Sequence, residues 1–294
     1  MAVTGAAGFL GAALTRRLVS DLRPAVVRGV TRRPPRHPTE GVTYANRLTA
    51  GQVAELDILF HLAGSSGIAE SLSDPIGDLR SNAELTIAYL EAIRSTGSRC
   101  TVVLASSCAV YGAVEGTVSE AQPPAPQTPY GASKLAAETY ASAYGRLYSV
   151  DTRIARIANP YGPGQRKLVV YDLAARALHE GRPLRVRGGG TEVRDFIHAD
   201  DVAQALIAIS LAEERGGIYN VGSGKPVALR EIAFLVAEAA GLTVEDVVFE
   251  GSHELGKVEW FSPQVRRLMD LGFRPRHGLR EGIEEVVRWM RRGT

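Results

Sequence analysis

The stretch VTGAAGFLG, residues 3–11, decides the fold class of this chain. It places Gly5, Gly8 and Gly11 between a short apolar run and an amphipathic segment. Glycines at this spacing allow a tight strand-to-helix turn, a close approach of the backbone to a pyrophosphate, and a helix packed closely on a sheet. The stretch predicts a dinucleotide-binding unit at the start of the chain, although three glycines could also serve packing alone.

Short apolar runs and longer amphipathic patterns alternate through the first half of the chain. Strands are predicted at residues 2–4, 25–30, 57–61, 101–106 and 152–157, and helices at 9–20, 82–95 and 130–144. Strands and helices that alternate at this pitch form βαβ units. We therefore expect an α/β fold with a doubly wound parallel sheet and helices on both of its faces.

The regular alternation of strand and helix patterns ends after residue 158. Further helices are predicted at residues 171–180, 202–211, 229–240 and 279–291, separated by glycine-rich or charged connections. We expect residues 1–158 to form a dinucleotide-binding domain and residues 159–294 mainly a smaller C-terminal substrate-binding lobe, with residues 196–222 returning to the first domain. No linker separates the two parts, so the boundary marks a change of role rather than a hinge.

The composition is that of an ordinary globular protein. Hydrophobic residues make up 45% of the 294-residue chain, charged residues make up 22%, and the net charge is +2. Binding to a phosphate backbone needs a larger basic excess, and no stretch reaches the roughly 18 apolar residues of a membrane span. We expect neither a nucleic-acid nor a membrane partner. Two cysteines without the neighbours of a metal site fit a cytoplasmic protein that holds no metal.

The segment YGASK, residues 130–134, carries the residues with the clearest chemistry. Tyr130 and Lys134 stand four apart at the start of a predicted helix, so their side chains share a face. A free phenol has a pKa of about 10, and a nearby ammonium group favours the phenolate. We expect Lys134 to lower the pKa of Tyr130, so that Tyr130 can act as an acid or a base near neutral pH.

Ser107 ends the apolar run TVVLASS, residues 101–107. It follows a predicted central strand, at the edge where doubly wound sheets bind ligands. Its hydroxyl can donate to the substrate oxygen that Tyr130 protonates or deprotonates. We therefore predict that Ser107, Tyr130 and Lys134 are catalytic. The alternative is a proline-rich surface loop with incidental serines, which the glycine motif disfavours.

Six segments occur in a fixed order along the chain. They are FHLAG at residues 60–64, SSCAVYG at 106–112, YGASK at 130–134, NPYGPGQ at 159–165, VRDFIHADDVA at 193–203 and YNVGSG at 219–224. With the glycine motif they resemble the extended short-chain dehydrogenase/reductase family, in its branch of nucleotide-sugar epimerases, dehydratases and ketoreductases. The resemblance implies a Rossmann fold, an NAD or NADP cofactor, a nucleotide-activated hexose as substrate, and a homodimer formed through the helices at 82–95 and 130–144.

The resemblance also implies which residues form the site, and in it Lys134 holds the nicotinamide ribose. The cofactor residues that it implies are Gly5, Gly8, Phe9, Leu10, Gly11, Thr31, Arg32, Arg33, Leu62, Ala63, Gly64, Asn82, Tyr130 and Lys134. The substrate residues that it implies are Ser65, Ser107, Asn159, Arg187 and Arg194. Arg194 could instead form a structural ion pair with Asp195.

Two histidines and one C-terminal segment have no assigned role in catalysis or binding. His61 and His198 lie within the motifs but are better explained by packing and hydrogen bonding than by acid catalysis. Relatives place a basic contact to the diphosphate near the C-terminus. The segment HELGKVEW, residues 253–260, departs from that pattern, so this contact has no assigned residue.

The end of the second predicted strand bears on the choice of cofactor. A domain that prefers NAD usually has an acidic residue there, which binds the ribose 2′-hydroxyl, whereas a 2′-phosphate favours arginine. This chain has Thr31, Arg32 and Arg33 instead, with no acidic residue nearby. The pattern favours NADP over NAD, and the alternative is a solvated basic loop.

The residues after Ser107 bear on the reaction. Relatives that dehydrate sugars have Asp-Glu directly after the catalytic hydroxyl, where this chain has Cys108 and Ala109. Cys108 is better explained as a small core residue than as a catalytic thiol. We expect hydride transfer at C4 of a nucleotide hexose without loss of water, by a 4-epimerase or by a 4-ketoreductase that consumes NADPH. The contrasting hypothesis is a non-catalytic NADP-binding sensor on the same fold.

Overall fold

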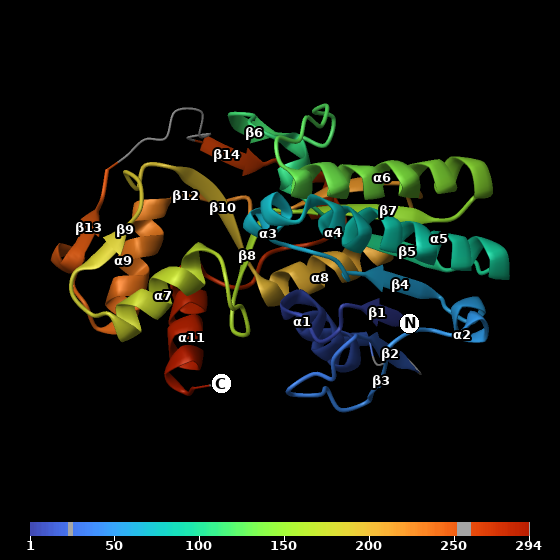
Figure 1. The fold of residues 1–294 in the computed structure, drawn as a ribbon, viewed down its shortest axis with the longest axis horizontal. Helices are drawn as coiled ribbons and strands as arrows, with labels where there is room; N and C mark the ends of the chain where they lie inside the picture. The colour runs from blue at the N-terminus through green and yellow to red at the C-terminus, as the bar shows by residue number, and fades with distance from the viewer. Residues whose placement is uncertain (23–25, 252–259, 294) are drawn as a thin grey trace.

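The computed structural model describes residues 1–22, 26–251 and 260–293 (Figure 1). Within these residues, seven parallel strands form the main sheet, in the order β11-β7-β5-β4-β1-β2-β3. The strands are β1 (Ala2–Thr4), β2 (Val27–Val30), β3 (Val42–Ala45), β4 (Ile58–His61), β5 (Thr101–Ser107), β7 (Thr152–Ile157) and β11 (Ile218–Val221). The expected α/β class with a doubly wound parallel sheet is confirmed.

Helices cover both faces of the main sheet (Figure 1). On one face lie α1 (Phe9–Arg17) and α8 (Ala199–Ser210), which share a core with Phe60. On the other face lie α5 (Leu85–Thr96) and α6 (Pro129–Tyr148), which share a core with Leu59. Consecutive residues of a strand point to opposite faces, so Leu59 and Phe60 each supply one of the two cores.

The chain changes its direction of winding beside β1. It passes from β1 through α1 to β2 and β3, and then returns through α2 (Ala50–Ala54) to β4 on the other side of β1. In doubly wound sheets a ligand crevice opens at the carboxyl ends of the strands at such a reversal. The glycine motif after β1 and the segment after β4 therefore face each other across the crevice.

A smaller sheet carries the C-terminal lobe. Its strands run in the order β12 (Pro226–Ala228), β10 (Val193–His198), β14 (Trp260–Pro263) and β6 (Gly116–Val118), and β8 (Asn159–Tyr161) pairs with β10. A separate pair joins β9 (Leu184–Val186) to β13 (Val247–Phe249). The helices α7 (Val169–His179), α9 (Leu229–Ala240) and α11 (Leu279–Arg291) pack around a core that includes Leu173, Val236 and Val286.

Several short helical elements complete the described fold. They are the π-helical segments Leu18–Leu22 and Arg80–Glu84, the 3-10 turns Cys108–Tyr111 and Val244–Asp246, and the helices α3 (Ile68–Ser73), α4 (Pro75–Leu79) and α10 (Arg266–Asp270). The helix expected from residue 82 begins only at Leu85, because a π-helical segment precedes it. Such segments often occur at functional sites. Within the described parts of the chain, no helix is long and apolar enough to cross a membrane.

The two sheets exchange segments of the chain. The strand β6 comes from the first half of the sequence but pairs with β14 in the smaller sheet. Conversely, α8 and β11 come from the second half but pack on or pair within the main sheet. The division of roles at residue 158 therefore stays a prediction.

Candidate active site

The glycine motif forms a narrow turn between β1 and α1. Gly5 has a φ of +70°, and a Cβ atom there would lie 2.9 Å from the amide nitrogen of Ala63. A Cβ atom on Gly11 would lie 2.1 Å from the carbonyl oxygen of Gly5. Gly8 precedes α1 and brings no side-chain cap. The first amide groups of α1 are thus free of a capping side chain, which fits a pyrophosphate.

Thr4 connects this turn to the segment after β4. Its hydroxyl oxygen accepts hydrogen bonds from the amide nitrogens of Leu62 at 3.1 Å and Ala63 at 3.0 Å. The same oxygen lies 2.8 Å from Nδ1 of His61. The hydroxyl proton can therefore go only to His61, which must present an unprotonated Nδ1. Burial lowers the pKa of His61 to about 3, so His61 is a neutral hydrogen-bonding residue rather than an acid.

The expected catalytic residues lie together at the carboxyl edge of the main sheet. Thr128 caps α6 by accepting a hydrogen bond from the amide of Gly131 at 3.1 Å, which starts the helix next to Tyr130. The Ser107 hydroxyl is hydrogen-bonded to the Tyr130 phenol. The Nζ atom of Lys134 lies 5.9 Å from the centre of the Tyr130 ring. These contacts agree with the spacing argument for a shared helix face.

The pKa of Tyr130 shifts in the direction opposite to the one expected. Burial raises the pKa of Tyr130, and the hydrogen bond from Ser107 only partly opposes this effect. The expectation that Lys134 lowers the pKa of Tyr130 is wrong for this structure, because the ammonium group donates to the carbonyl oxygen of Ala105 at 3.1 Å and burial of the phenol dominates. Burial also lowers the pKa of Lys134 to about 8. Both groups are mainly protonated at neutral pH.

Asn82 is buried and hydrogen-bonded to Ser133, the residue before Lys134. Its Nδ2 atom donates to Asp78 Oδ1 at 3.1 Å and to the Ser133 hydroxyl at 3.0 Å. Its Oδ1 atom is buried without a hydrogen-bond partner and faces Gly64. The sequence argument missed Asp78 and Ser133. The signals were present, because Ser133 precedes Lys134 and Asp78 stands four residues before Asn82.

A buried ion pair supports the site from behind. Arg156 on β7 donates to both carboxylate oxygens of Glu138 on α6, with the shortest distance 2.7 Å. Glu138 also accepts from the Ser106 hydroxyl at 2.5 Å. Glu138 follows Lys134 by four residues, so it extends the same helix face as Tyr130 and Lys134. The sequence analysis missed this pair, because nothing local indicates that residues 138 and 156 meet.

Cys108 and Ala109 provide no acid–base group. Cys108 begins a 3-10 turn directly after β5 and is only 7% exposed. Its thiol donates to the carbonyl oxygen of Arg156 at 3.3 Å, and burial raises its pKa. The amide of Ala109 donates to the Ser107 hydroxyl oxygen at 3.2 Å. Cys108 is therefore a core residue, as expected.

The residues expected to hold the substrate fall into two groups. Asn159 follows β7 and donates from Nδ2 to the carbonyl oxygen of Asp195 at 2.8 Å. Arg194 lies on β10, which pairs with the strand that begins at Asn159. The Asp195 carboxylate accepts hydrogen bonds from Ser223 and Gly224 at 2.7 to 2.8 Å. These hydrogen bonds, and not an ion pair with Arg194, stabilise the Asp195 carboxylate in the interior.

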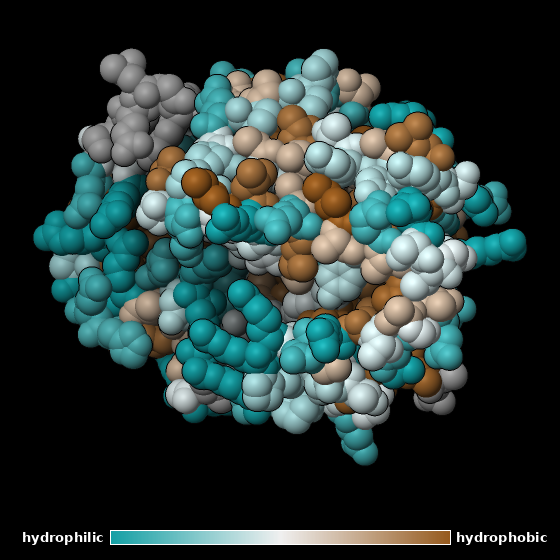
Figure 2. All heavy atoms as spheres, turned by 45° about the vertical axis from the view of Figure 1, so that its right-hand side comes forward, coloured by the Kyte–Doolittle hydropathy of each residue, from teal (hydrophilic) through white to brown (hydrophobic). Residues whose placement is uncertain are grey.

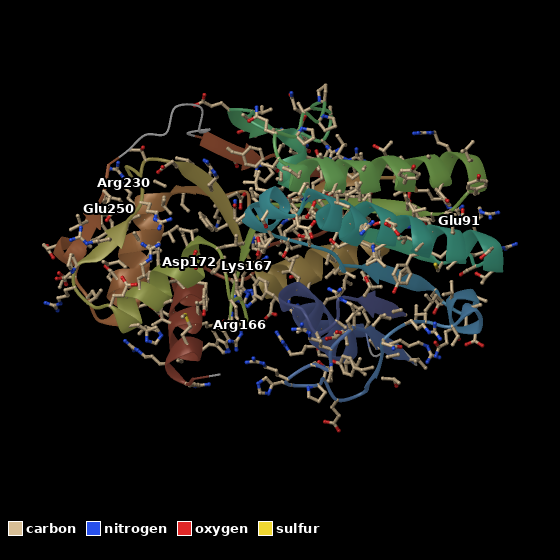
Figure 3. All side chains as sticks on the ribbon, viewed as in Figure 1. Glu91, Arg166, Lys167, Asp172, Arg230 and Glu250 are labelled. Atoms are coloured by element: carbon tan, nitrogen blue, oxygen red, sulfur yellow. The ribbon has the colours of Figure 1, made fainter. Side chains whose placement is uncertain are left out.

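Ser65 and Arg187 lie in different parts of the molecule. Ser65 is half-buried in the segment after β4, at the same edge as Ser107. Arg187 is exposed directly after β9, the strand that pairs with β13, whereas Arg194 lies on β10 of the smaller sheet. Figure 3 shows Lys167 in the loop between β8 and α7, where the two lobes meet. Lys167 forms an exposed ion pair with Glu70 on α3, at 3.6 Å. The segment HELGKVEW lies almost wholly outside the described residues.

The residues after β2 that are expected to bind the cofactor are exposed or half-buried. Arg32 and Arg33 follow β2 and face solvent, whereas Thr31 is half-buried. The Thr31 hydroxyl donates to the carbonyl oxygen of Arg33 at 2.8 Å. Among the described residues, the motif is joined to this end of β2 by the amide of Ala6, which donates to the carbonyl oxygen of Val30 at 3.3 Å. Near that motif Phe9 and Leu10 are half-buried, and Phe9 lies against Gly164 of the loop after β8.

His198 acts as a structural residue at the junction of the lobes. Its Nδ1 atom accepts a hydrogen bond from the amide of Asp200 at 3.3 Å and so caps α8. Its ring stacks on His277 at 4.1 Å between centroids, with 24° between the planes. The side chains of His198, Asp200 and His277 lie close enough for a metal. Nearly parallel rings direct their lone pairs side by side rather than toward one point, so this cluster does not fit one.

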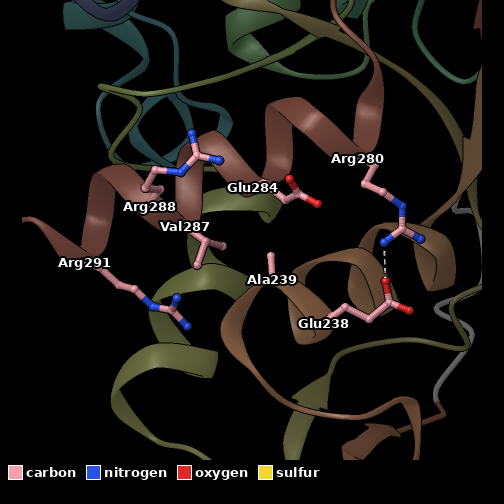
Figure 4. Close-up of a pocket in the computed structure, with 7 residues that line it drawn as sticks. All are labelled: Glu238, Ala239, Arg280, Glu284, Val287, Arg288 and Arg291. Carbon is pink, nitrogen blue, oxygen red and sulfur yellow. Dashed lines mark hydrogen bonds and ion pairs between the residues drawn. The ribbon is translucent and has the colours of Figure 1, made fainter.

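A surface cavity lies elsewhere in the C-terminal lobe (Figure 4). It has a volume of about 360 Å³ and opens between α9 and α11. Its lining residues are Glu238, Ala239, Arg280, Glu284, Val287, Arg288 and Arg291. None of the residues expected in the site lines it, so it is separate from the group around Tyr130.

The doubly wound sheet and the glycine-rich turn after its first strand define a fold of the short-chain dehydrogenase/reductase type. The family model for the NAD dependent epimerase/dehydratase family matches residues 1–222. The chain belongs to this family, which confirms the resemblance inferred from the sequence motifs.

Relatives of different reaction types resemble the chain about equally. UDP-glucose 4-epimerase from Mycolicibacterium smegmatis is 31% identical over 98% of this chain and 97% of that protein. dTDP-glucose 4,6-dehydratase from Streptomyces antibioticus is 30% identical over 98% of this chain and 91% of that protein. The solved structure of MoeE5 in complex with UDP-glucuronic acid and NAD superimposes with a TM-score of 0.87 at 34% identity, and covers 100% of this chain and 99% of that one.

Proposed function

We propose that this chain is an NAD(P)-dependent enzyme that exchanges a hydride with C4 of a nucleotide-activated hexose. The observation that carries the proposal is the hydrogen-bonded Ser107 and Tyr130, with Lys134 beside them, at the ligand-binding edge of a dinucleotide fold. The printed names of relatives support it, since one is a UDP-glucose 4-epimerase and MoeE5 is described with UDP-glucuronic acid and NAD.

Each residue of the group has a chemical role in this proposal. Tyr130, which is mainly protonated at neutral pH, gives its proton to the C4 oxygen when a 4-keto group is reduced, and its phenolate form takes the proton from the 4-hydroxyl group when that carbon is oxidised. Ser107 donates a hydrogen bond to the same substrate oxygen and fixes its position. Lys134 uses one of its donors on Ala105, which leaves others for the nicotinamide ribose. Bound NAD(P) supplies a nicotinamide ring that accepts and returns the hydride.

The reaction proposed here does not remove water from the sugar. Dehydration needs an acid and a base near C5 and C6 in addition to the hydride step, and the relatives that dehydrate sugars have Asp-Glu after the catalytic hydroxyl for this purpose. The corresponding residues here are a buried thiol with a raised pKa and an alanine. The similarity to the Streptomyces dehydratase therefore supports the fold and the hydride step but not its full reaction.

Two reactions fit this site, and a different observation favours each. A 4-epimerase, which oxidises and re-reduces one sugar, is favoured by the Mycolicibacterium relative. A 4-ketoreductase that consumes NADPH is favoured by Arg32 and Arg33. Incubation with UDP-, dTDP- and GDP-hexoses and their 4-keto-6-deoxy forms, followed by mass spectrometry, distinguishes them. An epimerase gives a new isomer of unchanged mass, and a reductase adds two hydrogens as NADPH disappears.

Three other outcomes of this incubation would decide against the proposal. Loss of water from a plain hexose would show that another group replaces the missing carboxylates. Tight binding of cofactor and sugar without turnover of any substrate would favour the non-catalytic sensor. Absence of binding to every nucleotide sugar would remove the substrate class.

We propose further that the cofactor is NADP(H) rather than NAD(H). Two exposed arginines after β2 offer planar, bidentate donors to a 2′-phosphate, and no acidic residue adjoins them. The MoeE5 complex contains NAD, so the proposal depends on these residues and not on the comparison. Dissociation constants for NADPH and NADH, measured by quenching of protein fluorescence, test it, and equal values would contradict it.

We also propose that two copies of the chain pair through α5 and α6. The helices α3 and α4 pack against α6, and large apolar side chains on these elements are 46 to 72% exposed: Ile68, Leu72, Ile76, Leu79, Tyr140, Leu147 and Tyr148. Figure 2 turns the end of the molecule that holds α3, α4 and α6 toward the viewer, and brown apolar residues lie on that face. Apolar groups gathered in this way commonly mark an interface. Light scattering at about 50 μM, well above the Kd of a standard interface, should give the dimer mass; a monomer would contradict the proposal.

A further inference from the structure

The buried carboxylate of Asp78, next to Tyr130 and Lys134, has no role in the proposed hydride transfer. Asp78 lies on α4 and is only 4% exposed. Its Oδ1 atom accepts from Asn82 Nδ2 at 3.1 Å, and its Oδ2 atom accepts from the Ser133 hydroxyl at 2.5 Å. A buried carboxylate is costly to desolvate unless its oxygens are hydrogen-bonded. The cost suggests that the charge is retained for a purpose beyond packing.

Asp78 and Ser133 together fix the orientation of the Asn82 amide. The amide nitrogen carries two hydrogens, and these two residues accept both, at 3.1 and 3.0 Å. The amide cannot flip, because a flip would place its oxygen against a carboxylate. Its Oδ1 atom must therefore point away from Asp78, on the side of Gly64, where a Cβ atom would lie only 2.4 Å from it.

The oriented oxygen is an acceptor that lacks a donor. Asn82 Oδ1 is buried and has no hydrogen-bond partner among the described residues. An unsatisfied buried acceptor is unfavourable, so a ligand that brings a donor gains affinity there. Ser133 is adjacent to Lys134 in sequence, and Gly64 follows the strand next to β1. A cofactor that presents nicotinamide to Tyr130 would therefore bring its ribose hydroxyls and carboxamide close to this oxygen.

The charge of Asp78 also acts on the catalytic pair. It raises the pKa of Lys134, as does Glu138, and both oppose the effect of burial. It raises the pKa of Tyr130 as well. His61, on β4, is the remaining ionisable group coupled to Lys134, and with its pKa of about 3 it is neutral in the physiological range.

We propose that Asp78 is a positioning residue for the hydride-transfer site, which aims the Asn82 carbonyl at a donor of the nicotinamide half of NAD(P) and keeps the Lys134 ammonium in place. This inference rests on the proposed function, because it assumes that nicotinamide binds beside Tyr130. Asp78 itself touches neither substrate nor cofactor. It acts through Asn82, Ser133 and the field on Lys134.

Three variants separate orientation, charge and helix stability. Asp78→Ala removes both the acceptor and the charge. Asp78→Asn removes only the charge, because its amide oxygen can accept from Asn82 while its nitrogen donates to Ser133, whose hydroxyl already lies 3.0 Å from the Tyr130 carbonyl oxygen. Asp74→Ala is the control, since the exposed Asp74 caps α4 at 2.9 Å without contacting Asn82.

The first readout is binding, which does not depend on turnover. Calorimetry should show that Asp78→Ala weakens NADPH and NADH about tenfold, the effect of one well-oriented hydrogen bond, while ADP, which lacks both the nicotinamide and its ribose, changes less than about twofold. Asp78→Asn should restore most of the affinity near neutral pH. Asp74→Ala should lower the melting temperature without this selectivity. Equal losses for NADH and ADP in Asp78→Ala would overturn the proposal.

The second readout is the pH dependence of NADH and NADPH binding. Removing a negative charge lowers the pKa of Lys134, so the alkaline loss of affinity in Asp78→Asn should move to lower pH than in the wild type. An unmoved profile would overturn the role of the charge. If Asp78→Ala does not fold, Ser133→Ala, which removes the other acceptor, should show the same selectivity at about threefold. If these selective effects appear while no nucleotide sugar is turned over, the proposed function fails and the positioning role stands.

Discussion

The two ends of the cofactor crevice are built in opposite ways. At the reacting end, Lys134 and Asn82 are buried, and each is held by hydrogen bonds from elements far apart in the sequence. At the other end, Arg32 and Arg33 are exposed on a loop after β2, where Thr31 donates from its hydroxyl to the nearby Arg33 carbonyl and from its amide to the Ala45 carbonyl of the adjacent strand. The contrast indicates that the chemistry depends on the packed core of the fold. In the proposed function, the choice of cofactor would depend on side chains that can change with little effect on folding.

The largest expected effect concerns the phenol at the reacting end. Tyr130→Phe should lower kcat by about 10² to 10⁴, because the variant has no group to exchange the substrate proton. NADPH binding should stay within about threefold of the wild type, because the ring still packs beside Lys134. Stopped-flow assays and fluorescence titrations measure the two quantities. Full turnover in the variant would remove Tyr130 from the mechanism.

The next effect concerns the buried ion pair behind the site. Glu138→Ala should lower the free energy of unfolding by about 3 to 5 kcal/mol, because it leaves Arg156 charged and unpaired in the interior. The control is Glu238→Ala, which breaks the exposed pair with Arg280 drawn in Figure 4 and should cost far less, because solvent screens that pair. Urea unfolding compares them. Similar losses would mean that burial does not distinguish the two pairs.

A smaller effect is expected at the exposed end. Replacing both Arg32 and Arg33 by alanine should weaken NADPH by about 1 to 3 kcal/mol and leave NADH nearly unchanged, because only NADPH carries a 2′-phosphate. Arg36→Ala, a change at an exposed arginine of the same loop, is the control. The melting temperature should not change. Parallel weakening of both cofactors would show that the arginines act on the shared diphosphate instead.

The smallest effect is a change in pH dependence at His61. The folded protein holds the pKa of His61 at about 3, below the ordinary value of 6.5. The unfolded chain therefore binds a proton that the folded chain does not, and stability falls as pH decreases below 6.5, by up to about 1.4 kcal/mol per unit. Urea unfolding at about pH 7, 6 and 5 should show the stability advantage of wild type over His61→Asn shrinking with acidification. A constant difference would contradict the assignment.

Local sequence patterns predicted much of the fold. The helices at 229–240 and 279–291 have the expected bounds, because their apolar residues repeat at helical spacing along one face. Shorter elements such as β3, α3 and α4 were missed, because segments of a few residues carry too little periodicity to identify. The helix expected from residue 82 starts later than predicted. A π-helical segment places Asn82, and no propensity signals it.

Local sequence patterns also predicted only part of the candidate site. The spacing of Tyr130 and Lys134 predicted a shared helix face, and the sheet-edge rule placed Ser107 beside them. The direction of the Tyr130 pKa could not be predicted in this way. It depends on how deeply the phenol is buried and on where the Lys134 ammonium is held. Asp78 was missed because its importance comes from contact with Ser133, 55 residues away.

The sequence alone determined the family, the doubly wound fold and the chemical types at the reacting centre. These follow from glycine spacing, from a four-residue helical repeat and from motif order, all of which are local or ordered along the chain. Only the tertiary structure decided the protonation of Tyr130 and Lys134, the orientation of Asn82 and the pairing of Glu138 with Arg156. These depend on desolvation and on hydrogen bonds between distant segments, and both arise only when the chain packs.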